Sequence, residues 1–164
     1  MSTNREFFLA CWQNEVAATV ALLRHLPTAA LDYRPHPVNR SAREIVEHLL
    51  AHAVDLAIIT REPQCDETLT FPVTDAAVAA DQYQALADAV TAAVSATSEA
   101  AWESEPVALL IRGESFITIP RTNMMWFFFF DIIHHRGQLS THVRPMGGTV
   151  PAIYGFSADT LAAG

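Results

Sequence analysis

The sequence predicts an all-α protein: a four-helix bundle with longer connections, formed as a single domain over residues 1–164. Three observations predict this class. Four long segments repeat apolar side chains every three or four residues, which is the period of amphipathic helices. The length of 164 residues falls within the range of about 100–200 residues for one domain. Hydrophobic residues make up 51% of the chain and charged residues 17%, which excludes intrinsic disorder as its main state.

The first two predicted helices have recognisable ends. The first is predicted over residues 3–25, and Pro27 ends it. The second is predicted over residues 41–60. Its start is marked by Ser41 and Glu44, which have the spacing of a capping box: the serine oxygen accepts an early amide proton and the glutamate reaches back to the serine amide. Both helices carry an apolar stripe that must be buried against a partner.

The third helix is predicted over residues 74–98, and the pattern changes after it. Residues 107–111 and 115–119 are two runs rich in β-branched side chains, separated by a short polar segment around Gly113. This pattern resembles a short β-hairpin. The hairpin would have to pack on the helices, because two strands alone are only marginally stable.

The last helix is predicted to open with Thr122 or Asn123 as its N-cap and to continue to about Met146, where a pair of glycines stops it. Aromatic side chains surround its first half, so we expect this half to be buried on most sides. The tail at residues 149–155 is expected to be extended and held in place by its apolar side chains.

The charge pattern argues against a nucleic acid as partner. The chain carries 10 basic and 18 acidic side chains, a formal net charge of -8, and has no basic stripe that could displace counterions from phosphates. The one local group of arginines, Arg34, Arg40 and Arg43, is interpreted as solvated side chains near helix ends. We therefore expect no nucleic-acid partner.

The cysteines and the apolar runs point to a cytoplasmic protein without a membrane partner. Cys11 and Cys65 are far apart and form no CxxC pair, so neither a disulfide scaffold nor a thiolate zinc finger is expected. The first residues show no basic region followed by an apolar core, so no signal peptide is predicted. The longest strongly apolar run, residues 124–130, is far shorter than the about 20 residues that a membrane helix needs.

The candidate chemistry lies on the last predicted helix. Asp131 and His135 are four residues apart, so they share one face of the helix, one turn apart. The same face continues to Gln138 and His142. A carboxylate in an apolar helix needs a cation, a metal or an exposed cleft, because burying it alone is costly. Asp131 and His135 could therefore bind a divalent metal.

A second pair, His48 and His52, has the same spacing on the second predicted helix. Metal sites in helical bundles are commonly built from facing helices, so this pair could supply a third ligand. The alternative for each is a core histidine with satisfied hydrogen bonds, and that alternative carries more weight for His52. His134 lies about 100° around the helix from His135, so it cannot replace Asp131, and we interpret it as a supporting residue.

Several segments together resemble the DinB/YfiT-like superfamily, bacterial four-helix bundles with a mononuclear metal site. The resemblance rests on His-Arg-Gly-Gln at residues 135–138, on residues 144–147 and 150–155 in the segment that follows, and on His48. It covers essentially the whole chain.

The resemblance implies a particular metal site. The family's usual ligands are one histidine in the second helix and two histidines one turn apart in the last helix. His48 and His135 match two of these positions, and Asp131 stands where the family usually has histidine. Three nitrogens favour zinc or nickel, and a carboxylate also admits iron or manganese. The substitution also leaves open a loss of tight binding, or entry of another histidine. The residues expected to support the site or to face a substrate are His52, His134, Gln138 and His142.

The resemblance also implies an activity. Family members with assigned activities resemble metal-dependent transferases or isomerases that act with a small thiol, on a small-molecule substrate. Two alternatives stay open: metal-activated hydrolysis, with bound water as the nucleophile, and a non-catalytic, stress-related protein whose metal only joins two helices. A homodimer is expected as well. The sequence assigns no catalytic residue.

Overall fold

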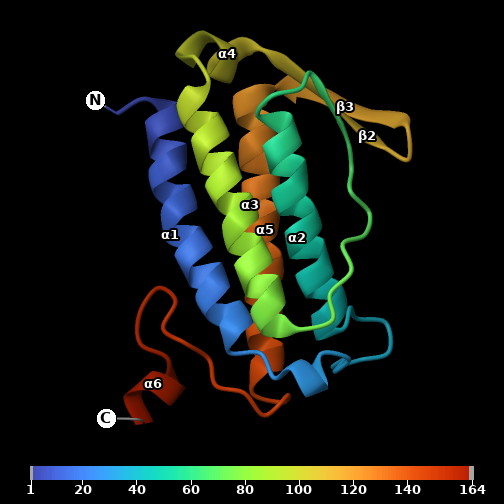
Figure 1. Ribbon diagram of the computed structural model, residues 1–164, viewed down its shortest axis with the longest axis vertical. Coiled ribbons are helices and arrows are strands. Elements are labelled where there is room, and N and C mark those ends of the chain that lie inside the picture. Colours follow the sequence, from blue (N-terminus) through green and yellow to red (C-terminus); the bar gives the residue numbers. More distant parts are fainter. Residues whose placement is uncertain (1, 163–164) are drawn as a thin grey trace.

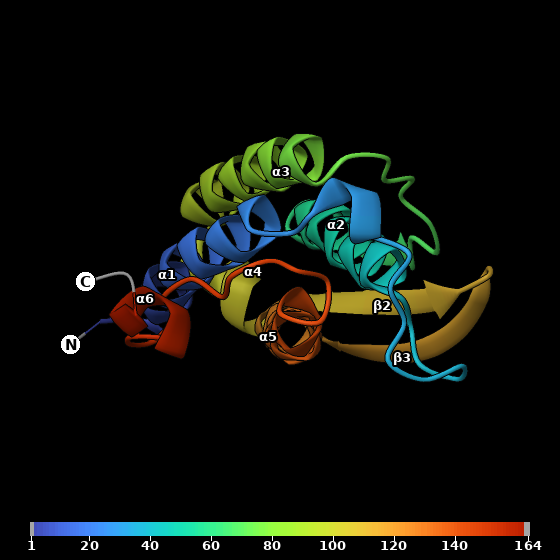
Figure 2. The same ribbon diagram turned by 90° about the horizontal axis from the view of Figure 1, so that it is seen from below.

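The computed structural model describes residues 2–162 and is mostly helical, with one small sheet. Four long helices lie side by side around a common core (Figures 1 and 2): α1 (Asn4–Arg24), α2 (Ala42–Ile59), α3 (Ala76–Ala96) and α5 (Arg121–Val143). The packed pairs are α1 with α3, α3 with α2, α2 with α5, and α5 with α1. Helices α2 and α5, which carry the candidate metal ligands, are therefore direct neighbours.

The remaining elements are short. They are η1 (Thr28–Ala30), β1 (Gln64–Asp66), α4 (Glu99–Ser104), β2 (Pro106–Ile111), β3 (Glu114–Pro120) and α6 (Ala158–Ala162). The three strands form one sheet in the order β1-β2-β3, with β1 parallel to β2 and β2 antiparallel to β3. Figure 1 shows the sheet at the end of the molecule where α2 ends and α5 begins.

The expectation of an all-α chain is therefore wrong in detail, although the predicted hairpin is confirmed as β2 and β3. Its turn places both Arg112 (φ 55°) and Gly113 (φ 80°) in the left-handed region, as tight hairpin turns require. Strand β1 was not predicted. It has three residues, only Cys65 of which is buried, so no alternation of apolar and polar side chains could reveal it.

Side-chain caps define the starts of three of the four long helices. Thr3 and Ser41 each form the complete capping box at the start of α1 and α2, which confirms the predicted starts. Asp75 caps α3 by accepting the amide of Val78.

The last helix departs from prediction at both ends. It begins at Arg121 rather than after a cap at Thr122 or Asn123, because β3 runs directly into it and Pro120 occupies the cap position without a side-chain bond. The Arg121 amide donates to Glu105 O at 2.7 Å instead. The helix ends at Val143, and the tail that follows contains the short helix α6.

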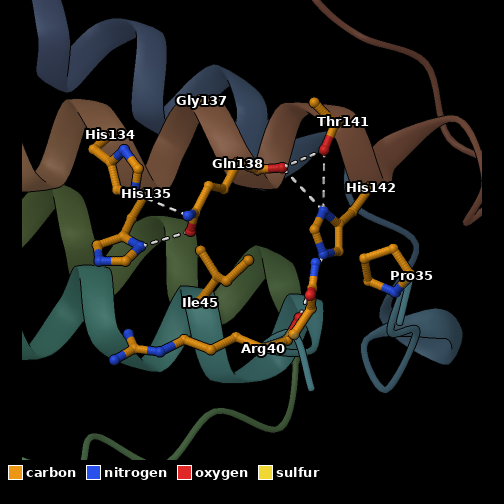
Figure 3. A pocket seen from close by; sticks show the side chains of 10 residues that line it. Pro35, Arg40, Ile45, His134, His135, Gly137, Gln138, Thr141 and His142 are labelled. Atoms are coloured by element: carbon orange, nitrogen blue, oxygen red, sulfur yellow. Dashed lines mark hydrogen bonds between the residues drawn. The ribbon is translucent and has the colours of Figure 1, made fainter. Parts of the chain in front are cut away.

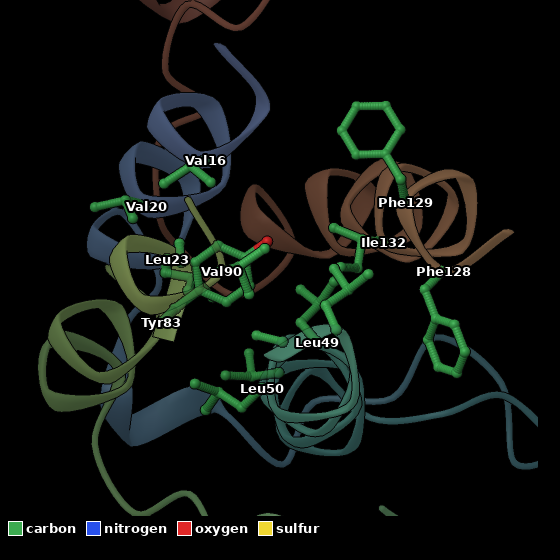
Figure 4. Packing of buried hydrophobic residues seen from close by; sticks show 14 of the residues in the cluster. Val16, Val20, Leu23, Leu49, Leu50, Tyr83, Val90, Phe128, Phe129 and Ile132 are labelled. Atoms are coloured by element: carbon green, nitrogen blue, oxygen red, sulfur yellow. The ribbon is translucent and has the colours of Figure 1, made fainter. Parts of the chain in front are cut away.

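The core runs along the inner faces of the four long helices (Figure 4). Leu49 and Leu50 of α2 meet Ile132 of α5 and Tyr83 of α3 there, and all four side chains are almost fully buried. Burying one such side chain contributes about 1.5–3 kcal/mol, so this packing fixes α2 against α5. No helix within residues 2–162 is long and apolar enough to cross a membrane.

Candidate metal centre

Helices α2 and α5 bring four predicted site residues together around one carboxylate oxygen. Asp131 Oδ2 lies 2.8 Å from His52 Nε2, 3.2 Å from His135 Nε2 and 3.4 Å from His48 Nε2. Each helix contributes a pair spaced by four residues, so the pairs project from facing helix surfaces. The carboxylate therefore lies where three imidazole rings converge.

Three of these side chains have the spacing of a metal site. One donor atom each from His48, Asp131 and His135 lies within 4.8 Å of the other two. Donor atoms around a tetrahedral ion with bonds of about 2.0–2.1 Å are about 3.3 Å apart. The distances from Asp131 Oδ2 to His135 Nε2 and His48 Nε2, 3.2 and 3.4 Å, match that separation. The donor set therefore fits a divalent ion in both chemistry and spacing.

The hydrogen bond that Gln138 accepts from His135 sets the tautomer of His135 (Figure 3). His135 Nδ1 lies 2.9 Å from the amide oxygen Gln138 Oε1, and Gln138 Nε2 lies 2.8 Å from His134 Nε2. An amide oxygen only accepts, so His135 Nδ1 carries the proton. In the neutral ring Nε2 then holds a lone pair, which faces Asp131. A lone pair against a carboxylate is unfavourable without a cation between them, and a metal ion satisfies both.

The electrostatics favour, for Asp131 and His48, the protonation states that metal binding needs. In their protonated forms, the rings of His135, then of His48 and His52, donate hydrogen bonds to Asp131 that hold its pKa far below its ordinary value. Burial is the main reason that the pKa of His48 is lowered, and it outweighs the attraction of Asp131. At neutral pH the carboxylate is ionised and the His48 ring is neutral, and these are the forms that bind metals.

His52 lies between two carboxylates. Its Nε2 faces Asp131, and its Nδ1 lies 3.5 Å from Oδ2 of Asp55. Burial lowers the pKa of His52, but the two carboxylates together outweigh burial, so the pKa is raised. Asp55 is fully buried and accepts the amide of Thr68 at 3.0 Å. His52 therefore joins the Asp131 carboxylate to the buried Asp55, and its role as a supporting residue stays a prediction.

Cys65 lies next to Asp55 and is not available as a nucleophile. Its side chain is buried and its sulfur lies 3.7 Å from Asp55 Oδ1. Burial, with the nearby Asp55 carboxylate, raises the pKa of the thiol to about 12. A thiolate is the reactive form of cysteine, so Cys65 offers no reactive thiol at this centre.

The other predicted residues lie along α5 beyond the cluster. Gln138 and His134 are exposed and bonded to each other, with Gln138 also holding His135. His142 is buried, and its ring nitrogens face backbone carbonyls: Nδ1 lies 2.9 Å from Gln138 O and Nε2 lies 3.4 Å from Arg40 O. His142 therefore joins α5 to the loop before α2 and stands apart from the metal ligands.

Two hollows give access to the ligand histidines. The larger, about 820 Å³, is drawn in Figure 3, and the smaller is about 440 Å³. Both are within or near the size range of about 300–1,000 Å³ of small-molecule sites. His135 lines the larger hollow and His48 the smaller, while Asn39 and Arg40 line both. A small molecule in either hollow would therefore touch a candidate ligand.

The sequence reasoning missed Asp55 and Arg40. Asp55 had a readable signal, since it is an acid inside an apolar helix three residues after His52. Arg40 had no local signal, because it lies in a loop and reaches the site only through the tertiary fold.

The fold and the site define a mostly helical protein with a candidate centre of two histidines and one carboxylate between neighbouring helices. The chain belongs to the DinB family: the family model matches residues 1–162, which confirms the resemblance seen in the sequence.

Other proteins are similar to this chain over most of its length. The chain is 30% identical over 165 aligned positions to the uncharacterized protein YrdA of Bacillus subtilis (strain 168), covering 96% of this chain and 92% of the relative. It is similar in fold to a DinB-like protein of Bacillus cereus ATCC 10987, with a TM-score of 0.71 and 24% identity over 90% of this chain and 95% of the other. The comparison with the DinB-like protein YjoA of Bacillus subtilis gives a TM-score of 0.68 with 20% identity, and it covers 87% of this chain and 92% of the other.

Proposed function

We propose that this protein is a metal-dependent enzyme in which His48, Asp131 and His135 hold one divalent ion and a small thiol reacts with a small electrophilic molecule. The observation that carries the proposal is the convergence of these three donor atoms within 4.8 Å. The tautomer set by Gln138 supports it, because the His135 lone pair is turned toward the same point.

The chain's own residues have defined tasks in this proposal. Gln138 orients the His135 ring, and His52 orients the carboxylate of Asp131. A divalent ion bound there supplies a Lewis acid that lowers the pKa of a coordinated thiol or water. Two nitrogens and one carboxylate oxygen admit zinc, nickel, iron or manganese. Because the pKa of Cys65 is raised to about 12, the thiol is supplied as a diffusible molecule.

An enzyme is favoured over a purely structural metal site by the number of donors and by access. Structural zinc sites have four protein ligands, whereas catalytic sites have three and an open position. Three donors gather here, and two hollows reach the histidines among them. A coordinated small molecule therefore has a route to the open position.

The experiment that tests the metal site is elemental analysis of untagged protein, with the ratio of metal to chain measured for matched variants. His135→Ala and Asp131→Ala should lose the metal. His25→Ala should keep it, since His25 bonds to Ala21 O at the end of α1. Asp131→His should keep the metal and shift its preference toward zinc or nickel. Unchanged metal affinity in Asp131→Ala would show that the proposed ligand set is wrong.

The thiol reaction is tested on the metal-loaded protein with mercaptoethanol and chlorodinitrobenzene. The sulfur forms a bond to the ring carbon, chloride leaves with the bonding pair, and the thiol proton goes to solvent. Turnover that is lost in His135→Ala supports a transferase. Hydrolysis of nitrophenyl acetate by the metal-loaded protein, without any thiol reaction, would contradict the transferase and favour a hydrolase.

A homodimer remains a proposal that rests on the family resemblance. Light scattering at tens of micromolar protein should give twice the chain mass of 18.0 kDa. A mass equal to one chain would contradict it.

A further inference from the structure

Arg40 differs from the two arginines beside it in having no anionic partner. Arg34 pairs with Glu44 at 2.9 Å, and Arg43 pairs with Asp32 at 2.7 Å. The Arg40 side chain makes neither an ion pair nor a hydrogen bond with any part of residues 2–162. From the sequence we interpreted all three arginines as solvated side chains, but among them only Arg40 lacks an ion pair within residues 2–162.

The larger hollow contains this free cation and no acidic residue. Its polar lining consists of Asn39, Arg40, His134, His135, Gln138, Thr141 and His142. Acidic side chains outnumber basic ones 18 to 10 in the whole chain, so a hollow without any acidic lining departs from the overall charge. An anion entering this hollow would meet a guanidinium and neutral hydrogen-bonding groups.

Two side chains, those of His142 and Arg34, hold the backbone at Arg40 in place. His142 Nε2 lies 3.4 Å from the Arg40 carbonyl, and the preceding carbonyl, that of Asn39, accepts a hydrogen bond from Arg34. Figure 3 shows the Arg40 side chain extending along the hollow from His142 toward His135. Its charge also acts on His48, as a minor contribution beside burial to the lowered pKa of that ring. Arg40 therefore lines one hollow together with His135 and the other together with His48.

From this placement we propose that Arg40 is the oxyanion subsite of the larger hollow: it binds a carboxylate or phosphate group of a small molecule whose other end reaches the metal centre. A guanidinium stays charged and matches two oxygens of either group through paired N–H donors. The proposal deepens the proposed function by naming the substrate class as anionic. The part that concerns Arg40 itself does not depend on a bound metal.

The first test uses metal-free protein and two probes, succinate and inorganic phosphate, titrated by calorimetry. The variants are Arg40→Gln, Arg40→Lys and the matched control Arg61→Gln, which removes the same charge from an exposed arginine outside both hollows. Arg40→Gln should weaken binding at least about tenfold, which is about 1.4 kcal/mol. Arg40→Lys should lose less, and Arg61→Gln should bind as wild type does.

The two probes distinguish the sources of the oxyanion. Tighter binding of succinate assigns a carboxylate, and tighter binding of phosphate assigns a phosphate group. Equal binding by wild type and Arg40→Gln, or no binding of either probe at millimolar concentration, would overturn the proposal. Unchanged urea unfolding of Arg40→Gln should show that the loss is local.

The second test uses zinc-loaded protein and two thiols that differ in charge. Wild type should bind mercaptopropionate more tightly than mercaptoethanol. Arg40→Gln should lose this preference and bind mercaptoethanol as before. Equal affinity of wild type for both thiols would overturn the subsite. If the protein fails to hold zinc, the proposed function fails, while the succinate and phosphate titrations still decide the role of Arg40.

Discussion

Two adjacent residues of α5, His135 and Arg136, enter two polar clusters of opposite character. Arg136 turns toward α1 and the tail: its guanidinium lies 2.5 Å from Glu15 and from the Tyr154 hydroxyl, and that hydroxyl donates to Glu15 at 2.7 Å. One cation and one anion compensate each other's charge here, although Nε and Nη1 of Arg136 have no hydrogen-bond partner among the described residues. His135 turns toward α2, where three imidazoles surround the Asp131 carboxylate.

The difference distinguishes a cluster whose charges are compensated within the chain from one whose donor atoms fit an added ion. The Arg136 side chain is only 3% exposed, and its charge is compensated within the chain. It also lies 5.0 Å from the centre of the Tyr154 ring, so it anchors the tail. In the other cluster the His135 lone pair faces a carboxylate, a mismatch that a cation removes. Neighbouring positions on one helix thus serve stability and chemistry separately.

The largest expected effect is on stability. Arg136→Ala leaves Glu15 buried without its partner and should lower the free energy of unfolding by about 3–5 kcal/mol. Metal affinity should stay unchanged. Urea unfolding of metal-free protein and a zinc titration measure the two quantities. Arg144→Ala, which breaks the exposed pair with Asp159, is the control and should cost at most about 1 kcal/mol. A large loss of zinc affinity in Arg136→Ala would show that the clusters are coupled.

The next effect is the stabilisation by metal and its pH dependence. Zinc at about 100 times its dissociation constant should stabilise wild type by about 2.7 kcal/mol and His135→Ala not at all. This gain should shrink as pH falls through about 6.5, because a protonated imidazole cannot ligate. The lowered pKa of His48 keeps that ring competent below the usual range. Melting temperatures with and without zinc, taken at several pH values, measure this stabilisation. A stabilisation by zinc that is independent of pH would contradict the histidine ligands.

The smallest expected effect is on zinc affinity, from loss of the residue that orients the ligand His135. Gln138→Leu removes the acceptor for His135 Nδ1 and should weaken zinc binding by about 10–100-fold. Gln138→Glu keeps an acceptor and should bind nearly as wild type. Because Gln138 is exposed, unfolding of the metal-free variants should change by no more than about 0.5 kcal/mol. Equal zinc affinity in wild type and Gln138→Leu would show that the tautomer is set otherwise.

The structural features that depend on neighbouring residues were predictable from the sequence. The capping residue Ser41 lies beside the amide that it satisfies, so spacing alone was enough. The start of α5 was misplaced because Thr122 is a good capping residue, whereas the chain enters this helix straight from β3. Strand β1 was missed because the strand with which it pairs, β2, lies beyond the whole of α3 in the sequence.

The candidate site was likewise predictable only where its residues are close in the sequence. The pairs spaced by four residues were readable on each helix, and their meeting depended on the packing of α2 against α5. The cluster of Glu15, Arg136 and Tyr154 was not readable, because its members come from three separate segments. Arg40 was grouped with its sequence neighbours, since only the fold shows that Arg34 and Arg43 have partners and Arg40 has none among the residues that the structure describes.

The sheet has a consequence for the order of folding events. Strand β1 follows α2, and β3 leads into α5, so the sheet joins the end of one ligand helix to the start of the other. Pairing Cys65 with Leu109 closes a loop that contains all of α3 and α4, and such non-local closure is slow because its entropy is lost before contacts form. The two ligand helices therefore reach their final register late. A metal that needs both helices stabilises contacts absent from the transition state, so it should slow unfolding while leaving the folding rate nearly unchanged.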